Sequence, residues 1–232
     1  MSPYQEFVKN RIWLIEYPIL YMGIGCNART SLIRADDGTL IVHSPAPLTD
    51  ETRRFVDDLG PVKTILAPGT FHNLYAAQWR DAYGDAQLYV CPGLERKVPS
   101  LRNAAIIRDG VRYPWSAELD HLTTQGFWLI NEVVFLHRST RTLIVTDLIE
   151  SFTDETPANW VTQFWLKYVF FMWNHPKPAP EYQLGWSSRR KARAMLERVL
   201  EWDFTQIVVG HGQLFRDDAK AVARRAWSSF LG

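Results

Sequence analysis

Three residues of metal-binding types stand at or just beyond the ends of predicted strands. His211 follows the β-branched run 206–209 and lies between two glycines, which leave the backbone around it bare. Asp147 ends a second apolar run, and His72 follows a third across a short turn. Two imidazoles and one carboxylate suit a borderline divalent cation. The sequence therefore predicts at most one metal site, held by His72, Asp147 and His211.

The chemistry of such a site follows from its ligand count. Two nitrogens and one carboxylate leave positions open for water or substrate, and a bound metal can lower the pKa of its water toward about 7. This predicts a metallohydrolase acting on an ester, thioester, lactone or phosphoester, with zinc as the favoured metal and iron or manganese as alternatives. The same ligands suit a non-haem iron redox enzyme. A further alternative is that the three residues are polar side chains at the rim of a sheet and that no metal binds to them.

Glu132 is a candidate because of strand pairing. A four-residue turn at 138–141 would join strands 127–136 and 142–146 as a hairpin. Counting back from this turn puts Glu132 nearly opposite Asp147. Asp147 and Glu132 are therefore the predicted catalytic residues, with Glu132 acting as a fourth ligand, a partner that orients a histidine, or a general base.

Two other histidines are weighed in the same way. His137 would pair near Thr142, beside the turn, and is interpreted as a surface or structural histidine rather than a ligand. His43 ends an early strand, where it either faces the site as a further ligand or packs as a structural residue. Ser44 is a weaker candidate to support the site.

The elements that must position these residues alternate between strands and helices. Hairpins precede helices in the first half of the chain, and the second half has the same order. This favours an α/β fold of two facing mixed β-sheets flanked by helices, in one domain over residues 1–232. The expected strands are 11–16, 30–34, 39–43, 62–67, 87–91, 127–136, 142–146 and 206–209, and the expected helices are 49–59, 72–82, 187–202 and 217–231.

Composition excludes several classes of function. With 26 basic and 25 acidic residues among 232, the net charge is +1, so no overall field favours nucleic acid. Cys26 and Cys91 are the only cysteines and form no close pair, which favours a reducing compartment without disulfides. No basic stretch followed by an apolar run opens the chain. We therefore expect a cytoplasmic protein that acts on a small molecule.

An aromatic-rich insertion is expected near residues 151–186. Its apolar part, Trp160 to Trp173, is shorter than the roughly 20 residues that a transmembrane helix needs, and it contains Gln163 and Lys167. It is therefore predicted as a buried or homodimer-forming helix, or else as a lid or a membrane-surface element. The alternative to a hydrolase is a catalytically reduced scaffold that binds an apolar ligand or a protein partner through this segment.

The order of elements, the strand that ends at Asp147 and the strand that ends in Gly210-His211-Gly212 resemble the metallo-β-lactamase superfamily. That resemblance implies an αββα sandwich and, in most members, a hydrolytic metalloenzyme. More narrowly, the chain is similar to an uncharacterised branch of the superfamily, a domain family of unknown function. The stretches that carry the narrower resemblance are 42–45, 65–68, 131–137 and 141–148.

The superfamily's Thr-His-x-His-x-Asp-His turn is degenerate in this chain. If His72 takes the place of the last histidine, then the earlier ligand positions hold Ala67, Gly69 and Phe71. The resemblance thus implies that the first metal site is lost, with His121 only a loose match to its remaining histidine.

The second metal site of the superfamily is retained more completely. Its ligands are the last histidine of the turn, the strand-end aspartate and the late glycine-flanked histidine. In this chain the resemblance assigns these positions to His72, Asp147 and His211.

Overall fold

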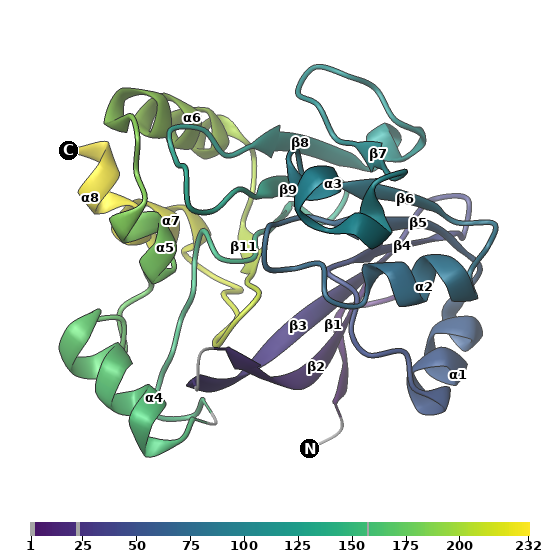
Figure 1. Ribbon diagram of the computed structural model, residues 1–232, viewed down its shortest axis with the longest axis horizontal. Helices are drawn as coiled ribbons and strands as arrows, with labels where there is room; N and C mark the ends of the chain where they lie inside the picture. Colours follow the sequence, from purple (N-terminus) through teal and green to yellow (C-terminus); the bar gives the residue numbers. More distant parts are fainter. Residues whose placement is uncertain (1–2, 22–23, 157) are drawn as a thin grey trace. The chain divides into compact units, whose positions relative to one another are not determined.

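A computed structural model describes residues 3–21, 24–156 and 158–232 of the chain (Figure 1). The chain forms two compact units. The first contains Met1–Tyr17 and Arg29–Leu119, and the second contains Pro18–Ala28 and Asp120–Gly232. The prediction of one domain over the whole chain stays a prediction.

A seven-stranded sheet underlies the first unit, and its strands follow one another in chain order. The pairs β1–β2 and β3–β4 are antiparallel, whereas β4 to β7 run parallel to one another. Parallel neighbours need crossover connections, and α1 and α2 provide two of them. The elements are β1 (Tyr4–Val8), β2 (Ile12–Tyr21), β3 (Ile24–Arg34), β4 (Leu40–His43), α1 (Asp50–Leu59), β5 (Val62–Ala67), α2 (Ala76–Ala82), β6 (Gln87–Val90), α3 (Leu94–Lys97) and β7 (Ala105–Ile106).

The start and end of α1 are specified by local sequence. The Thr49 hydroxyl accepts a hydrogen bond from the Thr52 amide, which caps the N-terminus, and Asp50 adds negative charge to the first turn. Gly60 ends the helix at φ 152°. The Tyr83 hydroxyl, just after α2, donates to the Asp57 carboxylate at 2.9 Å and so joins the two helices.

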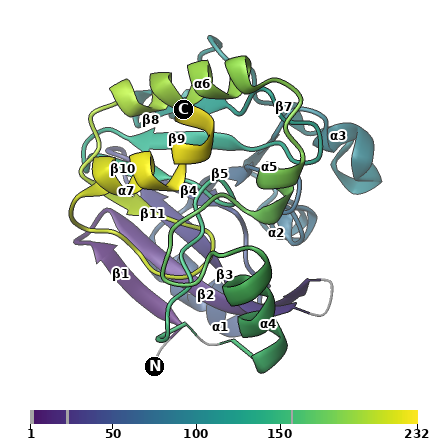
Figure 2. The same ribbon diagram turned by 90° about the vertical axis from the view of Figure 1, so that its left-hand side faces the viewer.

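The second unit contains a four-stranded sheet in the order β11-β10-β9-β8. Strands β9 and β10 are antiparallel, and β10 and β11 are parallel. Helices α6, α7 and α8 lie along one side of this sheet (Figure 2). The elements are β8 (Leu119–Thr123), β9 (Val133–His137), β10 (Thr142–Ile144), α4 (Trp160–Phe164), α5 (Pro180–Leu184), α6 (Arg189–Glu201), β11 (Gln206–Val208), α7 (Ala219–Ala226) and α8 (Ser228–Leu231).

Several element boundaries differ from those expected. The strand expected over 127–136 is shorter, since β9 begins only at Val133. The helix expected over 72–82 begins at Ala76. The aromatic segment forms α4 and then one π-helical turn, Trp165–Val169. No helix of the described residues has the length and apolar character that crossing a bilayer requires.

Candidate metal site

Strand pairing in the second unit places Asp147 beside His211. The parallel ladder of β10 and β11 pairs Ile144 with Val208, and each ligand candidate lies three residues beyond this pair. Backbone hydrogen bonds extend the ladder past the strands, from the Val145 amide to the Val208 carbonyl at 3.0 Å. The His211 Nε2 atom lies 3.5 Å from Asp147 Oδ1, and both side chains are buried. Main-chain register thus brings these two candidates together.

A backbone carbonyl fixes which nitrogen of His211 carries the proton. The Nδ1 atom lies 2.9 Å from the carbonyl oxygen of Asn27, and that oxygen can only accept a hydrogen bond. Nδ1 must therefore be the donor, which in the neutral ring leaves the lone pair on Nε2, facing Asp147. A histidine that binds a metal usually donates its other N–H to such a carbonyl or carboxylate.

The spacing of the two side chains suits a cation between them. A charge-assisted hydrogen bond would bring the two atoms to about 2.7–2.9 Å. Two ligands of a tetrahedral zinc, each about 2.0–2.1 Å from the metal, lie roughly 3.3 Å apart. The observed 3.5 Å between Nε2 and Oδ1 is closer to the second value.

The same pair holds a proton when no cation is bound. Burial alone would lower the pKa of His211, but the neighbouring Asp147 carboxylate raises this pKa well above its ordinary value. A metal ion therefore competes with a proton for this position.

Glu132 holds the backbone of the segment that carries Asp147. Its carboxylate accepts hydrogen bonds from the amides of Thr146 at 2.5 Å, Asp147 at 3.0 Å and Leu148 at 3.0 Å. The Tyr182 hydroxyl donates to the same carboxylate at 3.3 Å. Burial, followed by the neighbouring Asp147 charge, raises the pKa of Glu132 to about 8, although the amide hydrogen bonds oppose the shift. Glu132 lies opposite Asp147, as the hairpin count predicts, and its oxygens are directed at backbone donors.

A close approach of two backbones holds the His211 segment in place. The Ser151 amide donates to the His211 carbonyl at 3.2 Å, and the Gln213 amide donates to the Ser151 carbonyl at 2.7 Å. Gly212, between them, has a φ of 82°, and a Cβ there would collide with the Ser151 carbonyl oxygen. The glycine after His211 is thus required both by its backbone angle and by this approach.

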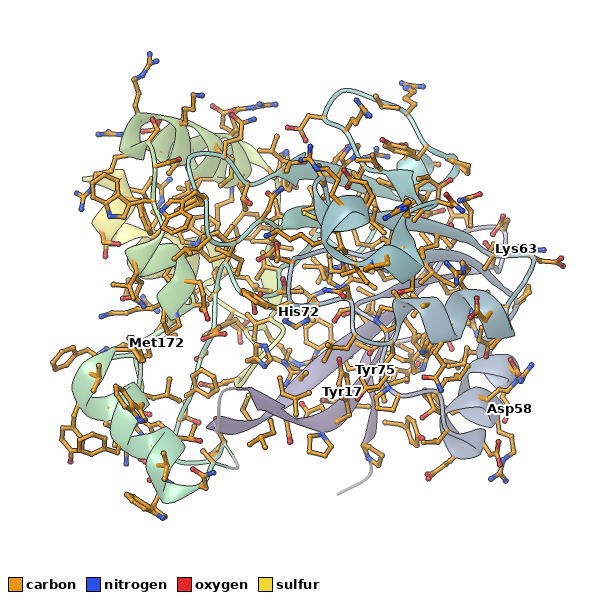
Figure 3. The ribbon with its side chains drawn as sticks, viewed as in Figure 1. Tyr17, Asp58, Lys63, His72, Tyr75 and Met172 are labelled. Atoms are coloured by element: carbon orange, nitrogen blue, oxygen red, sulfur yellow. The ribbon has the colours of Figure 1, made fainter. Side chains whose placement is uncertain are left out.

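His72 belongs to the first unit, in the segment between β5 and α2. Its Nδ1 atom lies 2.7 Å from the Ser44 hydroxyl oxygen, and both residues are buried. Ser44 adopts a φ of 57°, a left-handed conformation that is uncommon for serine and directs its hydroxyl to this partner. Tyr75, three residues after His72, makes an edge contact with Tyr17, with the ring centroids 5.9 Å apart (Figure 3).

The other candidate histidines lie in different surroundings. His43 ends β4 and is buried. Its burial and the charge of His72 both lower its pKa. His121 lies on β8, half-buried, with its ring 6.4 Å from that of Phe135. His137 pairs with Thr142 as expected and is buried, with Nδ1 2.7 Å from the Thr140 hydroxyl oxygen. His137 is therefore not at the surface, and its interpretation as a structural histidine stays a prediction.

His43 predicts a specific dependence of stability on pH. Burial, followed by the His72 charge, lowers the pKa of His43 to about 3. As pH falls below about 6.5 the unfolded chain takes up a proton at this residue and the folded chain does not, so stability is lost. Relative to a His43→Gln variant, the wild type should lose about 2 kcal/mol of unfolding free energy between about pH 7.5 and pH 5.

Urea unfolding at the two pH values checks this expectation. His121→Gln serves as the control, because His121 is a half-buried histidine on β8, outside the pair of His43 and His72. Parallel curves for the wild type and His43→Gln would contradict it.

Several solved structures have the same fold as this chain. The metallo-β-lactamase DIM-1, in a crystal structure after exposure to ceftazidime, has a TM-score of 0.66 at 12% identity, over 97% of this chain and 96% of that one. A metallo-β-lactamase from Pontibacter korlensis has a TM-score of 0.63 at 11% identity, over 96% of each chain. FIM-1 from Pseudomonas aeruginosa, in its mono-zinc form, has a TM-score of 0.61 at 8% identity, over 100% of this chain and 98% of that one. These similarities confirm the predicted metallo-β-lactamase-like fold class.

Sequence comparison identifies the family. A search of curated proteins finds no significant match. A family described as "Domain of unknown function (DUF4336)" matches residues 9–164, which is more than half of the chain. The chain therefore belongs to the family DUF4336, and its fold is that of the metallo-β-lactamases.

Proposed function

We propose that His72, Asp147 and His211 hold one divalent cation, with zinc favoured, and that the protein is a metal-dependent hydrolase. All three side chains are buried, and together they are a group of ligand types that could hold a metal ion. The proposal adds His72 to the Asp147–His211 pair. The observation that carries it is the orientation of His211, whose Nδ1 atom donates to the Asn27 carbonyl and whose Nε2 atom lies 3.5 Å from Asp147 Oδ1.

Two nitrogens and one carboxylate fit a catalytic metal better than a structural one. Structural zinc sites are closed by four protein ligands, whereas catalytic sites keep a position for water or substrate. When bound, such a cation supplies Lewis-acid chemistry and lowers the pKa of a water toward about 7. The mono-zinc form of FIM-1 is an instance of one zinc on this fold. The proposed substrates are esters, thioesters, lactones or phosphoesters.

The remaining polar groups orient the proposed ligands. The Asn27 carbonyl sets the tautomer of His211, and the Ser44 hydroxyl does the same for His72 if it accepts from Nδ1. We assign Glu132 as a positioning residue, because three backbone amides occupy its carboxylate. Asp147 and His211 are the ligands that we propose from the second unit.

Metal content tests this proposal most directly. The protein, purified without chelators or added metal, should contain about one equivalent of zinc by mass spectrometry. Saturation at about 100 times Kd adds about 2.7 kcal/mol of stability, so removal by chelator should lower Tm by roughly 5–10 °C, and zinc should restore it.

Other outcomes have definite meanings. Less than about a tenth of an equivalent of any metal, with no rise in Tm on adding zinc, iron or manganese, would overturn the proposal. It would favour the scaffold that binds through its aromatic segment. Iron in place of zinc would favour the redox alternative.

A further inference from the structure

Five exposed aromatic side chains cover the outer side of α4 and of the π-helical turn that follows. Trp160 is 80% exposed, Tyr168 66% and Phe171 60%, and half or nearly half of Phe164 and Trp165 is exposed. We call these five residues the aromatic face. In Figure 1 the segment (green) stands at the end of two extended connections, apart from α5 to α8 of its own unit.

The opposite side of the same segment explains why these rings face outward. Thr162 and Leu166 are buried, and Leu166 packs with Phe152, Met172 and Trp173 in a small core of its own. Phe164 and Tyr168 each lie two residues further along, roughly half a helical turn away. The buried side thus anchors the segment, and the aromatic face is the opposite, exposed side.

The aromatic face carries no charge. Lys167 is the only ionisable group between residues 160 and 173 apart from Tyr168. Its ammonium lies 4.4 Å from the centre of the Trp173 ring, 3.3 Å from Gln163 Oε1 and 3.9 Å from Asp154 Oδ1. Lys167, the only cationic side chain of this segment, therefore interacts with groups beside the buried side and not with the aromatic face.

The area of the aromatic face argues against a second copy of the chain as its occupant. Aromatic side chains offer about 150–250 Å² each, so five of them at these exposures present about 600 Å². A stable protein interface buries about 800 Å² on each partner and has a polar rim with hydrogen bonds. A charge-free face of this size is at the upper end of what a single chain exposes without a function.

We propose that the aromatic face inserts into the interfacial layer of a zwitterionic phospholipid membrane. Tryptophan and tyrosine rings favour this layer because one end of each is apolar and the other can hydrogen-bond to water. The segment lies in the surface and does not span it. Asp154 and Glu155 are exposed beside it, so anionic lipids add no attraction.

Sedimentation of the full chain with phosphatidylcholine vesicles tests this proposal. The wild type should sediment with the vesicles, and replacing a fifth of the lipid with phosphatidylserine should not strengthen binding. Phe164→Ser with Tyr168→Ser should weaken partitioning at least about tenfold. The matched control is Trp128→Ser with Leu184→Ser, since these residues are 65% and 71% exposed elsewhere in the unit. That control should sediment like the wild type.

A second measurement locates the inserted residues. Brominated phosphatidylcholine should quench part of the tryptophan fluorescence, and Trp160→Phe with Trp165→Phe should reduce this quenching while sedimentation persists. A wild type that stays in the supernatant would overturn the proposal, as would equal loss of binding in the control. A vesicle-independent dimer that dissociates when Phe164 and Tyr168 are replaced would also overturn it and make a second copy the occupant.

Discussion

Replacing His211 with alanine should weaken zinc binding by more than about 100-fold, because loss of a direct ligand exceeds the 10- to 100-fold cost of losing a hydrogen-bonding partner of one. The Nε2 atom of His211 faces Asp147 at 3.5 Å, at a position that the ladder of β10 and β11 sets. Competition with a chromophoric chelator measures the affinity. Circular dichroism shows whether the variant is folded.

His137→Ala is the matched control for this experiment. It also removes a buried imidazole from the same four-stranded sheet, but one whose two nitrogens lie near the Thr140 and Ser139 hydroxyls. Its zinc affinity should stay within about threefold of the wild type, whatever stability is lost. Equal losses of affinity in the two variants would refute the assignment of His211 as a ligand.

Replacing Glu132 with glutamine should lower both stability and zinc affinity. The glutamine amide group has one acceptor oxygen and two N–H donors, so it cannot accept from the Thr146 amide on one side and from the Asp147 and Leu148 amides on the other. Unsatisfied buried donors cost about 1–3 kcal/mol each, and we expect the unfolding free energy to fall by about 2–4 kcal/mol. Because the Asp147 backbone is then released, zinc affinity should fall about 10- to 100-fold.

Two controls separate positioning from general loss of stability. Leu196→Ala in the buried side of α6 should cost a comparable 2–5 kcal/mol, with zinc affinity unchanged in the folded protein. Tyr182→Phe removes the hydroxyl that lies 3.3 Å from the Glu132 carboxylate and 3.4 Å from the Thr124 hydroxyl, and it leaves the three amides bound, so its effect on affinity should be less than about fivefold. If Leu196→Ala lowered zinc affinity as much as Glu132→Gln, the positioning role would be wrong.

The hairpin and the strand ends could be predicted from the sequence because they depend on local patterns of residue type. The turn at 138–141 fixes the register of β9 and β10, so pairing of His137 with Thr142 and the approach of Glu132 to Asp147 could be counted from the chain. Alternating and β-branched runs likewise give β5 and β11. The cap of α1 at Thr49 follows from residue type.

The contacts that orient the histidines could not be found in this way. Asn27 reaches His211 through its backbone carbonyl, which every residue type has, so no side-chain pattern marks it. Ser44 was a weaker candidate to support the site, but its contact with His72 involves a left-handed backbone angle that serine rarely adopts, so the partner could not be predicted from residue type. Both contacts join parts of the chain distant in sequence, and only tertiary folding brings them together.

The aromatic segment was ambiguous for a different reason. Its sequence is apolar almost all the way round, so periodicity alone does not separate a buried helix from an exposed one. The structure separates the two sides through the small core around Leu166 and Met172.

The ladder that joins β10 to β11 has a consequence for how such a chain diverges. The spacing of Asp147 and His211 is set by main-chain hydrogen bonds, which nearly any apolar strand sequence can supply. Substitutions that keep β10 and β11 apolar can therefore accumulate while the spacing of Asp147 and His211 is kept. Only changes that break the ladder, or that replace one of the two residues, alter it.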